Sequence, residues 1–149
     1  MIGQQPFHVR DADFTADFAH LRAVRDPVFV IEQGVPLALE KDALDADCTH
    51  VLAFDVQGRP IGTGRLTPQR SIGRMAVLPE WRGRGVGDAL LMRLIALSKA
   101  KAWPDVSLHA QVRAMGFYLK HGFTAYGPVY EEAGILHQSM SLDLTAYGN

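Results

Sequence analysis

A short glycine-rich stretch at residues 77–88, Val-Leu-Pro-Glu-Trp-Arg-Gly-Arg-Gly-Val-Gly-Asp, constrains the fold of this chain more than any other feature. An apolar run at residues 72–78 leads into it, and Pro79 ends that run. Three glycines and two arginines then fall within residues 82–87, and an amphipathic helix pattern begins directly afterwards. Strand, glycine-rich turn and helix together are typical of an anion site, because turn amides and a helix N-terminus point their partial positive charge the same way. The sequence therefore predicts an anion-binding turn at residues 82–87.

Spacing excludes two common nucleotide motifs from this turn. A P-loop requires G-x-x-x-x-G-K-[ST], and the chain contains no Gly-Lys pair. A dinucleotide-binding turn requires G-x-G-x-x-G, and Asp88 stands where the third glycine would have to be. The pattern that remains is Arg82-x-x-Gly85-x-Gly87, with further backbone amides between these residues.

Length and composition limit the classes of protein to which the chain can belong. Its 149 residues are 48% hydrophobic and 21% charged, which suits a single domain over residues 1–149 with a full core. The formal net charge is −1, so no overall positive field exists to hold a nucleic acid or an anionic membrane. No apolar stretch reaches the roughly 18 residues of a membrane-spanning helix, and residues 1–8 lack a signal-peptide pattern. The one cysteine, Cys48, permits no internal disulfide, which is typical of a cytoplasmic protein. Together with the charge and the lack of a membrane helix, this leads us to expect a cytoplasmic protein without nucleic-acid or membrane partners.

Hydrophobic periodicity predicts the element order β-α-α-β-β-β-α-β-α-β-β. The second helix is expected to start anew at Asp26-Pro27, because Asp is a favoured N-cap and Pro a favoured first helical residue. Short connections make residues 49–78 an antiparallel meander, and the helix that follows the glycine turn makes one parallel βαβ crossover. The fold class is therefore α+β with a mixed, mostly antiparallel central sheet. Strands are expected at residues 7–10, 49–55, 59–66, 71–78, 106–110, 123–126 and 135–144, and helices at 14–25, 28–33, 86–98 and 111–120.

Two local features add expectations about the meander and the segment before it. Gly62 and Gly64 inside one strand indicate a bulge or a close backbone approach. The segment after Pro36 is expected to be a solvated loop, or to draw a cationic ligand to its four acids, Glu40, Asp42, Asp45 and Asp47.

Two motifs in register resemble the GNAT superfamily of N-acyltransferases. Arg82-x-x-Gly85-x-Gly87, between an apolar strand and an amphipathic helix, looks like the acyl-CoA signature of that family. Residues 111–123, Gln-x-x-Ala-x-x-Phe-Tyr-x-x-x-Gly-Phe, resemble the family's Asn-x-x-Ala-x-x-x-Tyr-x-x-x-Gly-Phe. Residues 28–36, 108–111 and 134–137 further resemble the ElaA-like branch. The resemblance covers nearly the whole chain and implies a GNAT-like sheet with helices on both faces.

The resemblance implies acetyl-CoA as cosubstrate, with its pyrophosphate on the glycine turn and its pantetheine along the preceding strand. The expected general acid is Tyr118, and a backbone N–H near Met75 or Ala76 is expected to stabilise the thioester oxygen. Gln111 replaces the family's usual Asn but keeps the amide group. The full set of expected cofactor-binding residues is Met75, Ala76, Val77, Arg82, Gly83, Arg84, Gly85, Val86, Gly87 and Gln111.

Two residues compete as the general base that takes a proton from the acceptor. In this fold Glu32 borders the acceptor site, and His137 lies on the last paired strand close to the cleft. Either residue could instead be structural, Glu32 as a solvated helix residue and His137 as a hydrogen-bonded strand histidine. Arg65 and Arg74 could bind an acidic group on the acceptor, although exposed strand arginines are commoner. No histidine pair has metal-ligand spacing, so no metal is expected.

Two functions are consistent with these residues. The first is an N-acetyltransferase that moves an acetyl or short acyl group from acetyl-CoA to a primary amine on a small molecule or peptide, by direct attack in a ternary complex. The second is a non-catalytic acyl-CoA-binding sensor or interaction module on the same fold. The presence of Tyr118 favours the enzyme. A homodimer is a further expectation from the family.

Overall fold

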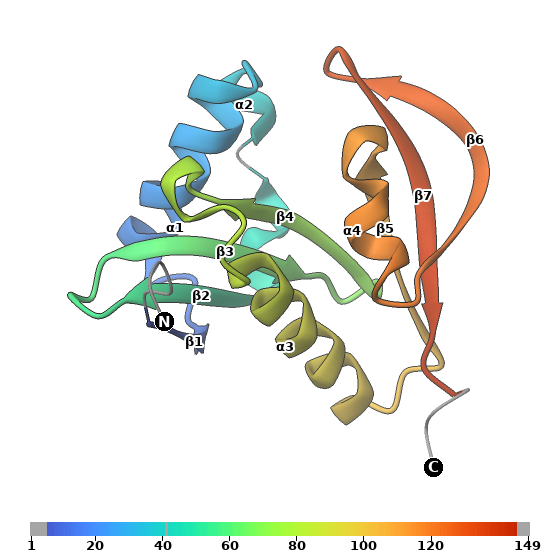
Figure 1. Ribbon diagram of the computed structural model, residues 1–149, viewed down its shortest axis with the longest axis horizontal. Coiled ribbons are helices and arrows are strands. Elements are labelled where there is room, and N and C mark those ends of the chain that lie inside the picture. Colours follow the sequence, from blue (N-terminus) through green and yellow to red (C-terminus); the bar gives the residue numbers. More distant parts are fainter. Residues whose placement is uncertain (1–5, 41, 146–149) are drawn as a thin grey trace.

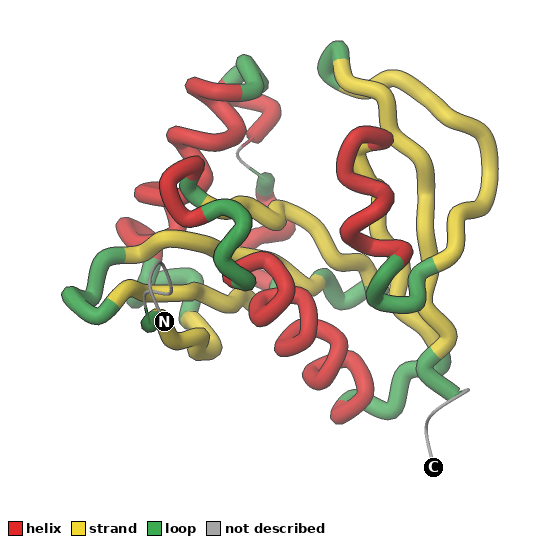
Figure 2. Tube along the Cα trace, in the orientation of Figure 1, coloured by secondary structure: helices red, strands yellow, loops and turns green. Residues whose placement is uncertain are grey.

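One seven-stranded sheet runs through the chain in the order β1-β2-β3-β4-β5-β7-β6 (Figures 1 and 2). The computed structural model describes residues 6–40 and 42–145. The strands are β1 (Phe7–Ala12), β2 (Thr49–Asp55), β3 (Pro60–Leu66), β4 (Ser71–Val77), β5 (Asp105–Gln111), β6 (Thr124–Glu132) and β7 (Ile135–Asp143). The helices are α1 (Phe18–Arg25), α2 (Leu37–Glu40), α3 (Val86–Ala100) and α4 (Met115–Leu119), with a π-helical segment η1 (Asp26–Glu32) and 3-10 turns η2 (Ala43–Asp47), η3 (Pro79–Trp81) and η4 (Val112–Ala114).

The sheet is antiparallel except between β4 and β5, which are parallel and connected through α3. This confirms the predicted α+β fold with one parallel crossover. The parallel pairing covers only two positions, Ser71↔Ser107 and Ile72↔Leu108, and beyond them the two strands separate (Figure 1). The β3–β4 register shifts in the same region, and Arg74 adopts a left-handed conformation with φ of 50°. The extra residue of this bulge bends β4 away from β5 and opens a gap in the sheet.

Helices pack on both faces of the sheet, as expected. Side chains along β2 alternate between two clusters, with Val51 in the cluster beneath α3 and Leu52 in the cluster beneath α1. On the α3 side, a Cβ added at Gly64 would lie 2.8 Å from Leu94 Cδ1, and one added at Gly62 would lie 2.9 Å from the α3 side chains. The atoms closest to both glycines are therefore side chains, chiefly of α3, rather than another backbone, and this packing places α3 directly on β3. The expected bulge occurs beside Gly64, where the β3–β4 register shifts between Thr63 and Arg65.

Several predicted element boundaries were wrong. The first helix begins at Phe18 rather than near residue 14, and β1 extends to Ala12. The chain does not restart at Asp26, because Arg25 and Asp26 are both right-handed helical and α1 continues directly into η1. The wider π-helical spacing accommodates Pro27, which has no N–H to donate within the segment. The helix expected at residues 111–120 divides into η4 and the short α4. The strand expected at residues 123–126 is longer and continues to Glu132.

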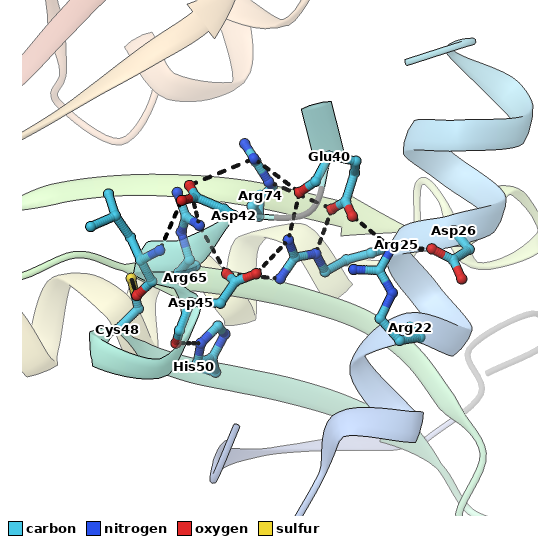
Figure 3. Close-up of polar contacts among 11 residues, drawn as sticks. Arg22, Arg25, Asp26, Glu40, Asp42, Asp45, Cys48, His50, Arg65 and Arg74 are labelled. Carbon is cyan, nitrogen blue, oxygen red and sulfur yellow. Dashed lines mark hydrogen bonds and ion pairs between the residues drawn. The ribbon is translucent and has the colours of Figure 1, made fainter. Parts of the chain in front are cut away.

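The acidic segment is not a solvated loop. Glu40 and Asp45 are only 2% and 3% exposed. Glu40 is bound to arginines of α1, and Asp45 is bound to one arginine of α1 and one of β3 (Figure 3). Asp42 is partly buried in the same cluster, and only Asp47 is exposed as expected. Because the charges of Glu40 and Asp45 are already paired inside the protein, they are not available to draw a cationic ligand.

Candidate active site

The gap between β4 and β5 holds two adjoining pockets. The turn pocket, of about 670 Å³, lies against the glycine turn and includes Val77, Arg82 and Gly85 in its wall. The sheet pocket, of about 440 Å³, lies on the other side of the gap and includes Arg74 and His137. The walls of both pockets contain Gln33, Met75, Ala114 and Tyr118. The site can therefore hold two ligands that meet beside these four residues.

The glycine turn presents open backbone to the turn pocket. Gly83 and Gly85 have φ of 74° and 86°, which an L side chain rarely adopts, and a Cβ at either position would meet nothing within 4 Å. Gly85 is the N-cap of the fifteen-residue α3, so the first N–H groups of that helix face the same region. A Cβ at Gly87 would lie 3.4 Å from Phe117, so α4 closes the turn from the other side. The geometry is that of an anion cradle.

The two arginines of the turn are engaged differently. Arg82 donates from Nε to the Val77 carbonyl at 2.9 Å and holds the Glu32 carboxylate with both terminal nitrogens, at 2.8 and 2.6 Å. This bond lowers the pKa of Glu32 below its usual value, so the carboxylate stays ionised. Arg84 instead lies over the Trp81 ring, 5.3 Å from its centroid. The pair of Glu32 and Arg82 connects η1 to the turn across the mouth of the turn pocket.

The strand before the turn forms one wall of both pockets. Met75, Ala76 and Val77 all lie in the wall of the turn pocket. The Ala76 side chain is buried against Val24 and Val28 on one side of the sheet. Val86, the first residue of α3, has its side chain in the core cluster on the other side. From Gly73 onward the β4 edge that faces the gap has no β5 partner. Its backbone groups are therefore available to an extended ligand.

Tyr118 on α4 lies between the two pockets. Its ring makes edge contacts with Phe117 and Phe123, at centroid distances of 5.0 and 6.0 Å. Burial raises the pKa of Tyr118 to about 12, so the phenol remains protonated at neutral pH and can donate a hydrogen bond into the gap.

His137 and Gln111 lie opposite each other on β7 and β5, in the wall of the sheet pocket. The His137 Nδ1–H donates to the Ile135 carbonyl at 2.8 Å, an assignment that follows because a carbonyl can only accept. In the neutral ring this tautomer leaves the lone pair on Nε2, and Tyr130 stacks on the ring at a centroid distance of 5.7 Å. Gln111 donates to Gln33 at 3.0 Å, and this bond connects β5 to the end of η1 beside both pockets.

A family model described as an acetyltransferase (GNAT) domain matches residues 19–144 of the chain. The chain belongs to the GNAT acetyltransferases. Among curated relatives, the uncharacterized N-acetyltransferase YjcF of Bacillus subtilis is 37% identical over 127 aligned positions, and the match covers 80% of this chain and 88% of that protein. The protein ElaA of Escherichia coli is 31% identical over 153 aligned positions, 97% of this chain and 98% of that protein.

Solved structures place this GNAT chain in the same branch. The crystal structure of E. coli ElaA matches with a TM-score of 0.81 at 27% identity and covers 93% of this chain and 100% of that one. An acyl-CoA N-acyltransferase from Pseudomonas aeruginosa matches with a TM-score of 0.80 at 29% identity, over 92% of this chain and 99% of that one. The predicted resemblance to the GNAT superfamily and its ElaA-like branch is confirmed, and the chain is an acyltransferase.

Several residues of this GNAT site were not found from the sequence. Gln33 lies in both pockets, and Phe117 packs beneath Gly87. Asp88, in the first turn of α3, binds Lys120 at 3.1 Å and His121 at 2.7 Å and so ties α4 to the glycine turn. The sequence carried one signal for these contacts, because Phe117 stands directly before Tyr118 in the second motif.

Neither a metal-binding cluster nor a membrane-spanning helix is found among the described residues. No group of three or more His, Cys, Asp or Glu side chains in residues 6–40 and 42–145 could hold a metal ion. No helix among the same residues is both long and apolar enough to cross a membrane.

Proposed function

We propose that the chain transfers an acetyl or short acyl group from acyl-CoA to a primary amine by direct attack in a ternary complex. The observation that carries the proposal is the separation of β4 from β5 after two paired positions, which leaves two adjoining pockets with Tyr118 between them. A thioester and an amine must meet at one point, and two pockets that share a wall allow this. The acceptor itself is a small molecule or a peptide.

The turn pocket suits CoA. The open amides of Gly83 and Gly85 and the N-terminus of α3 would hold the pyrophosphate. Arg82 holds the Glu32 carboxylate with both terminal nitrogens, so it would contribute its positive charge and its remaining N–H groups to the phosphate. Met75, Ala76 and Val77 would pair their backbone with pantetheine, and Arg84, Val86 and Gly87 would contribute backbone groups. Gln111 lies in the sheet pocket and donates to Gln33, which lines both pockets. We therefore assign Gln111 to the junction of the two ligands.

Aminolysis of a thioester forms a carbon–nitrogen bond and breaks a carbon–sulfur bond. A backbone N–H at Met75 or Ala76 would stabilise negative charge on the carbonyl oxygen. The Tyr118 hydroxyl would give its proton to the departing sulfur. The same burial that raises the pKa of Tyr118 also raises the proton affinity of a thiolate beside it.

His137 is the better placed of the two candidate bases. Its Nε2 lone pair belongs to a ring in the sheet pocket, whereas Glu32 lies in the turn pocket with its carboxylate bound by Arg82. We therefore expect His137→Asn to lower kcat roughly 100-fold, and Glu32→Gln to leave kcat close to the wild-type value. Thiol release from acetyl-CoA with a panel of primary amines measures both variants. The opposite ranking would assign the base to Glu32.

The same assay tests the proposed function. Thiol release that depends on an amine, with the acetylated amine found by mass spectrometry, is the expected result. Stabilisation by CoA without turnover of any amine would favour the acyl-CoA sensor instead. The cytoplasmic location and the homodimer remain predictions.

A further inference from the structure

A cluster of four arginines and four carboxylates (Figure 3) adjoins the sheet pocket, whose wall includes its members Glu40, Arg65 and Arg74. It joins α1, the acidic segment, β3 and β4. Its charges are formally balanced, but they are not equally well paired. The members are Arg22, Arg25, Asp26, Glu40, Asp42, Asp45, Arg65 and Arg74.

Arg74 is the member whose hydrogen bonds are least satisfied. Its Nη2 donates to the Glu40 backbone carbonyl at 3.1 Å. Its remaining contacts are two long ion pairs, 3.5 Å from Nε to Glu40 Oε2 and 3.8 Å from Nη2 to Asp42 Oδ2. Nε is buried without a hydrogen-bond acceptor among the described residues. Within residues 6–40 and 42–145, the bond to the Glu40 carbonyl is the one hydrogen bond that the five N–H donors of this guanidinium make.

The neighbouring carboxylates are committed to other donors. Glu40 binds Arg22 and Arg25 at 2.6 Å with its two oxygens. Asp42 accepts from the Leu44 N–H at 2.9 Å with one oxygen and from Arg65 at 3.0 Å with the other. Neither carboxylate can turn toward Arg74 without losing a shorter bond.

The backbone at Arg74 is held in a conformation that has a cost. Among described non-glycine residues with positive φ, Arg74 is the only one inside a strand, since the others lie in turns or bends. A left-handed non-glycine residue costs of the order of 1 kcal/mol and persists where the surroundings enforce it. Here the bulge of β4 fixes the direction of the side chain, which lies in the wall of the sheet pocket and remains 28% exposed.

The electrostatic surroundings of Arg74 favour one more negative charge. Burial lowers the pKa of Arg74 from its usual value, and the charges of Arg65 and Arg25 lower it further, beyond what Glu40 and Asp42 restore. The pKa of Arg65 in the same cluster is instead raised, because its hydrogen bonds to Asp45 and Asp42 outweigh the effect of its burial. The Nε of Arg65 is also buried without an acceptor among the described residues, but Arg65 has these two carboxylate partners at 2.9 and 3.0 Å, whereas Arg74 has no carboxylate closer than 3.5 Å.

We propose that Arg74 binds an oxyanion of the acceptor, a carboxylate or a phosphate, in the sheet pocket. The proposal rests on the proposed function and names its substrate class, an amine that carries an acidic group a few bonds away. The spacing is short because Arg74 directly precedes Met75, a residue that lines both pockets. A guanidinium with free neighbouring donors matches an oxyanion bidentately, which an ammonium does not.

Matched acceptors test the proposal directly. Glycine carries a carboxylate and O-phosphoethanolamine carries a phosphate beside the primary amine. Glycinamide and ethanolamine are their counterparts with the same amine but without the anionic group. We expect at least one anionic acceptor to exceed its neutral counterpart in kcat/KM by roughly 10- to 100-fold, the range of a charge-assisted hydrogen bond. The preferred member of the anionic pair identifies carboxylate or phosphate. Equal kcat/KM values within both pairs for the wild-type enzyme would overturn the proposal.

Two arginine variants separate binding from folding. Arg74→Met should abolish the anionic preference through a higher KM for the anionic acceptor, while acetyl-CoA still raises the melting temperature. Arg70→Met is the matched control, because Arg70 is also left-handed but pairs with Asp105 at 3.4 Å on the surface and should keep the preference. An Arg74→Met enzyme that retains the preference would overturn the proposal. If that variant does not fold, the comparison of wild-type acceptors decides.

A binding measurement keeps this proposal distinct from the proposed function. N-acetylglycine should bind the CoA-loaded wild-type protein at least roughly tenfold more tightly than N-acetylglycinamide. That result without turnover of any amine would support the anion site and count against the transferase. Turnover without this difference in binding would support the transferase and overturn the anion site.

Discussion

Replacing Tyr118 by Phe should slow acyl transfer roughly 100-fold or more while acetyl-CoA still binds. General acid catalysis contributes about 10²- to 10⁴-fold to such reactions, and the substitution removes the hydroxyl alone. The ring contacts with Phe117 and Phe123 remain, so the fold and the junction of the two pockets should be preserved. Single-turnover thiol release measures the loss, and the shift in melting temperature with acetyl-CoA measures binding.

A second tyrosine supplies the control for this experiment. Tyr126 is 50% exposed on β6, and Tyr126→Phe should keep the wild-type rate. The pH profile adds a check, because the pKa of Tyr118 is raised to about 12 and its ionisation should not lower the rate until the pH approaches that value. Unchanged transfer by Tyr118→Phe would remove Tyr118 from the mechanism.

Replacing Arg25 by Met should cost about 3–5 kcal/mol of unfolding free energy. Arg25 is 1% exposed and binds Glu40 at 2.6 Å and Asp45 at 3.1 Å. Met fills a similar volume but leaves two buried carboxylates with fewer donors, and an uncompensated buried charge is expensive. Urea unfolding near neutral pH measures the loss.

Acid should reduce this difference between variant and wild type. Burial by itself would raise the pKa of Asp45, but hydrogen bonds from Arg25 and Arg65 outweigh it and hold that pKa below its usual value. A carboxyl whose pKa is lower in the folded state stabilises the protein above its unfolded pKa of about 3.9, and that stabilisation is lost as the pH falls. Without Arg25 the folded pKa of Asp45 rises, so less stability remains to be lost in acid.

An exposed ion pair is the control for the buried one. Arg93 binds Asp11 with both side chains nearly half exposed, and Arg93→Met should cost less than about 1 kcal/mol. Equal losses in Arg25→Met and Arg93→Met, or a loss in Arg25→Met that does not shrink in acid, would contradict the assignment of the cluster as a buried charge network.

The parts of the site that are local in sequence could be predicted. Strand, glycine turn and helix follow one another within residues 71–100, so the positive φ at Gly83 and Gly85 and the start of α3 followed from residue types at fixed spacing. Tyr118 was found in the same way, from its place in a motif. The seven strands were found because short apolar runs bounded by turn residues are typical of strands. Within residues 49–78, the short turns also specified an antiparallel meander.

Pairings between distant residues could not be predicted. Glu32 and Arg82 are fifty positions apart, and Arg74 lies thirty-four positions after Glu40. In the sequence, acids beside Pro and Gly resemble a solvated loop, since nothing local shows that Arg25 and Arg65 are brought to them by α1 and β3. Burial of Glu40 and Asp45 is a consequence of tertiary packing, which also overrode the helix start at Asp26.

Titration of acetyl-CoA into two glycine variants tests the central claim most directly. Gly85 and Gly58 have φ of 86° and 81° and open space around a Cβ, so Gly85→Ala and Gly58→Ala should each cost about 1 kcal/mol of stability. Only the methyl group at Gly85 would enter the turn pocket. We expect wild type and Gly58→Ala to bind acetyl-CoA alike and Gly85→Ala to bind at least roughly tenfold more weakly, about 1.4 kcal/mol. A wild-type protein that binds no acetyl-CoA, or a Gly85→Ala variant that binds it as tightly as Gly58→Ala, would contradict the account.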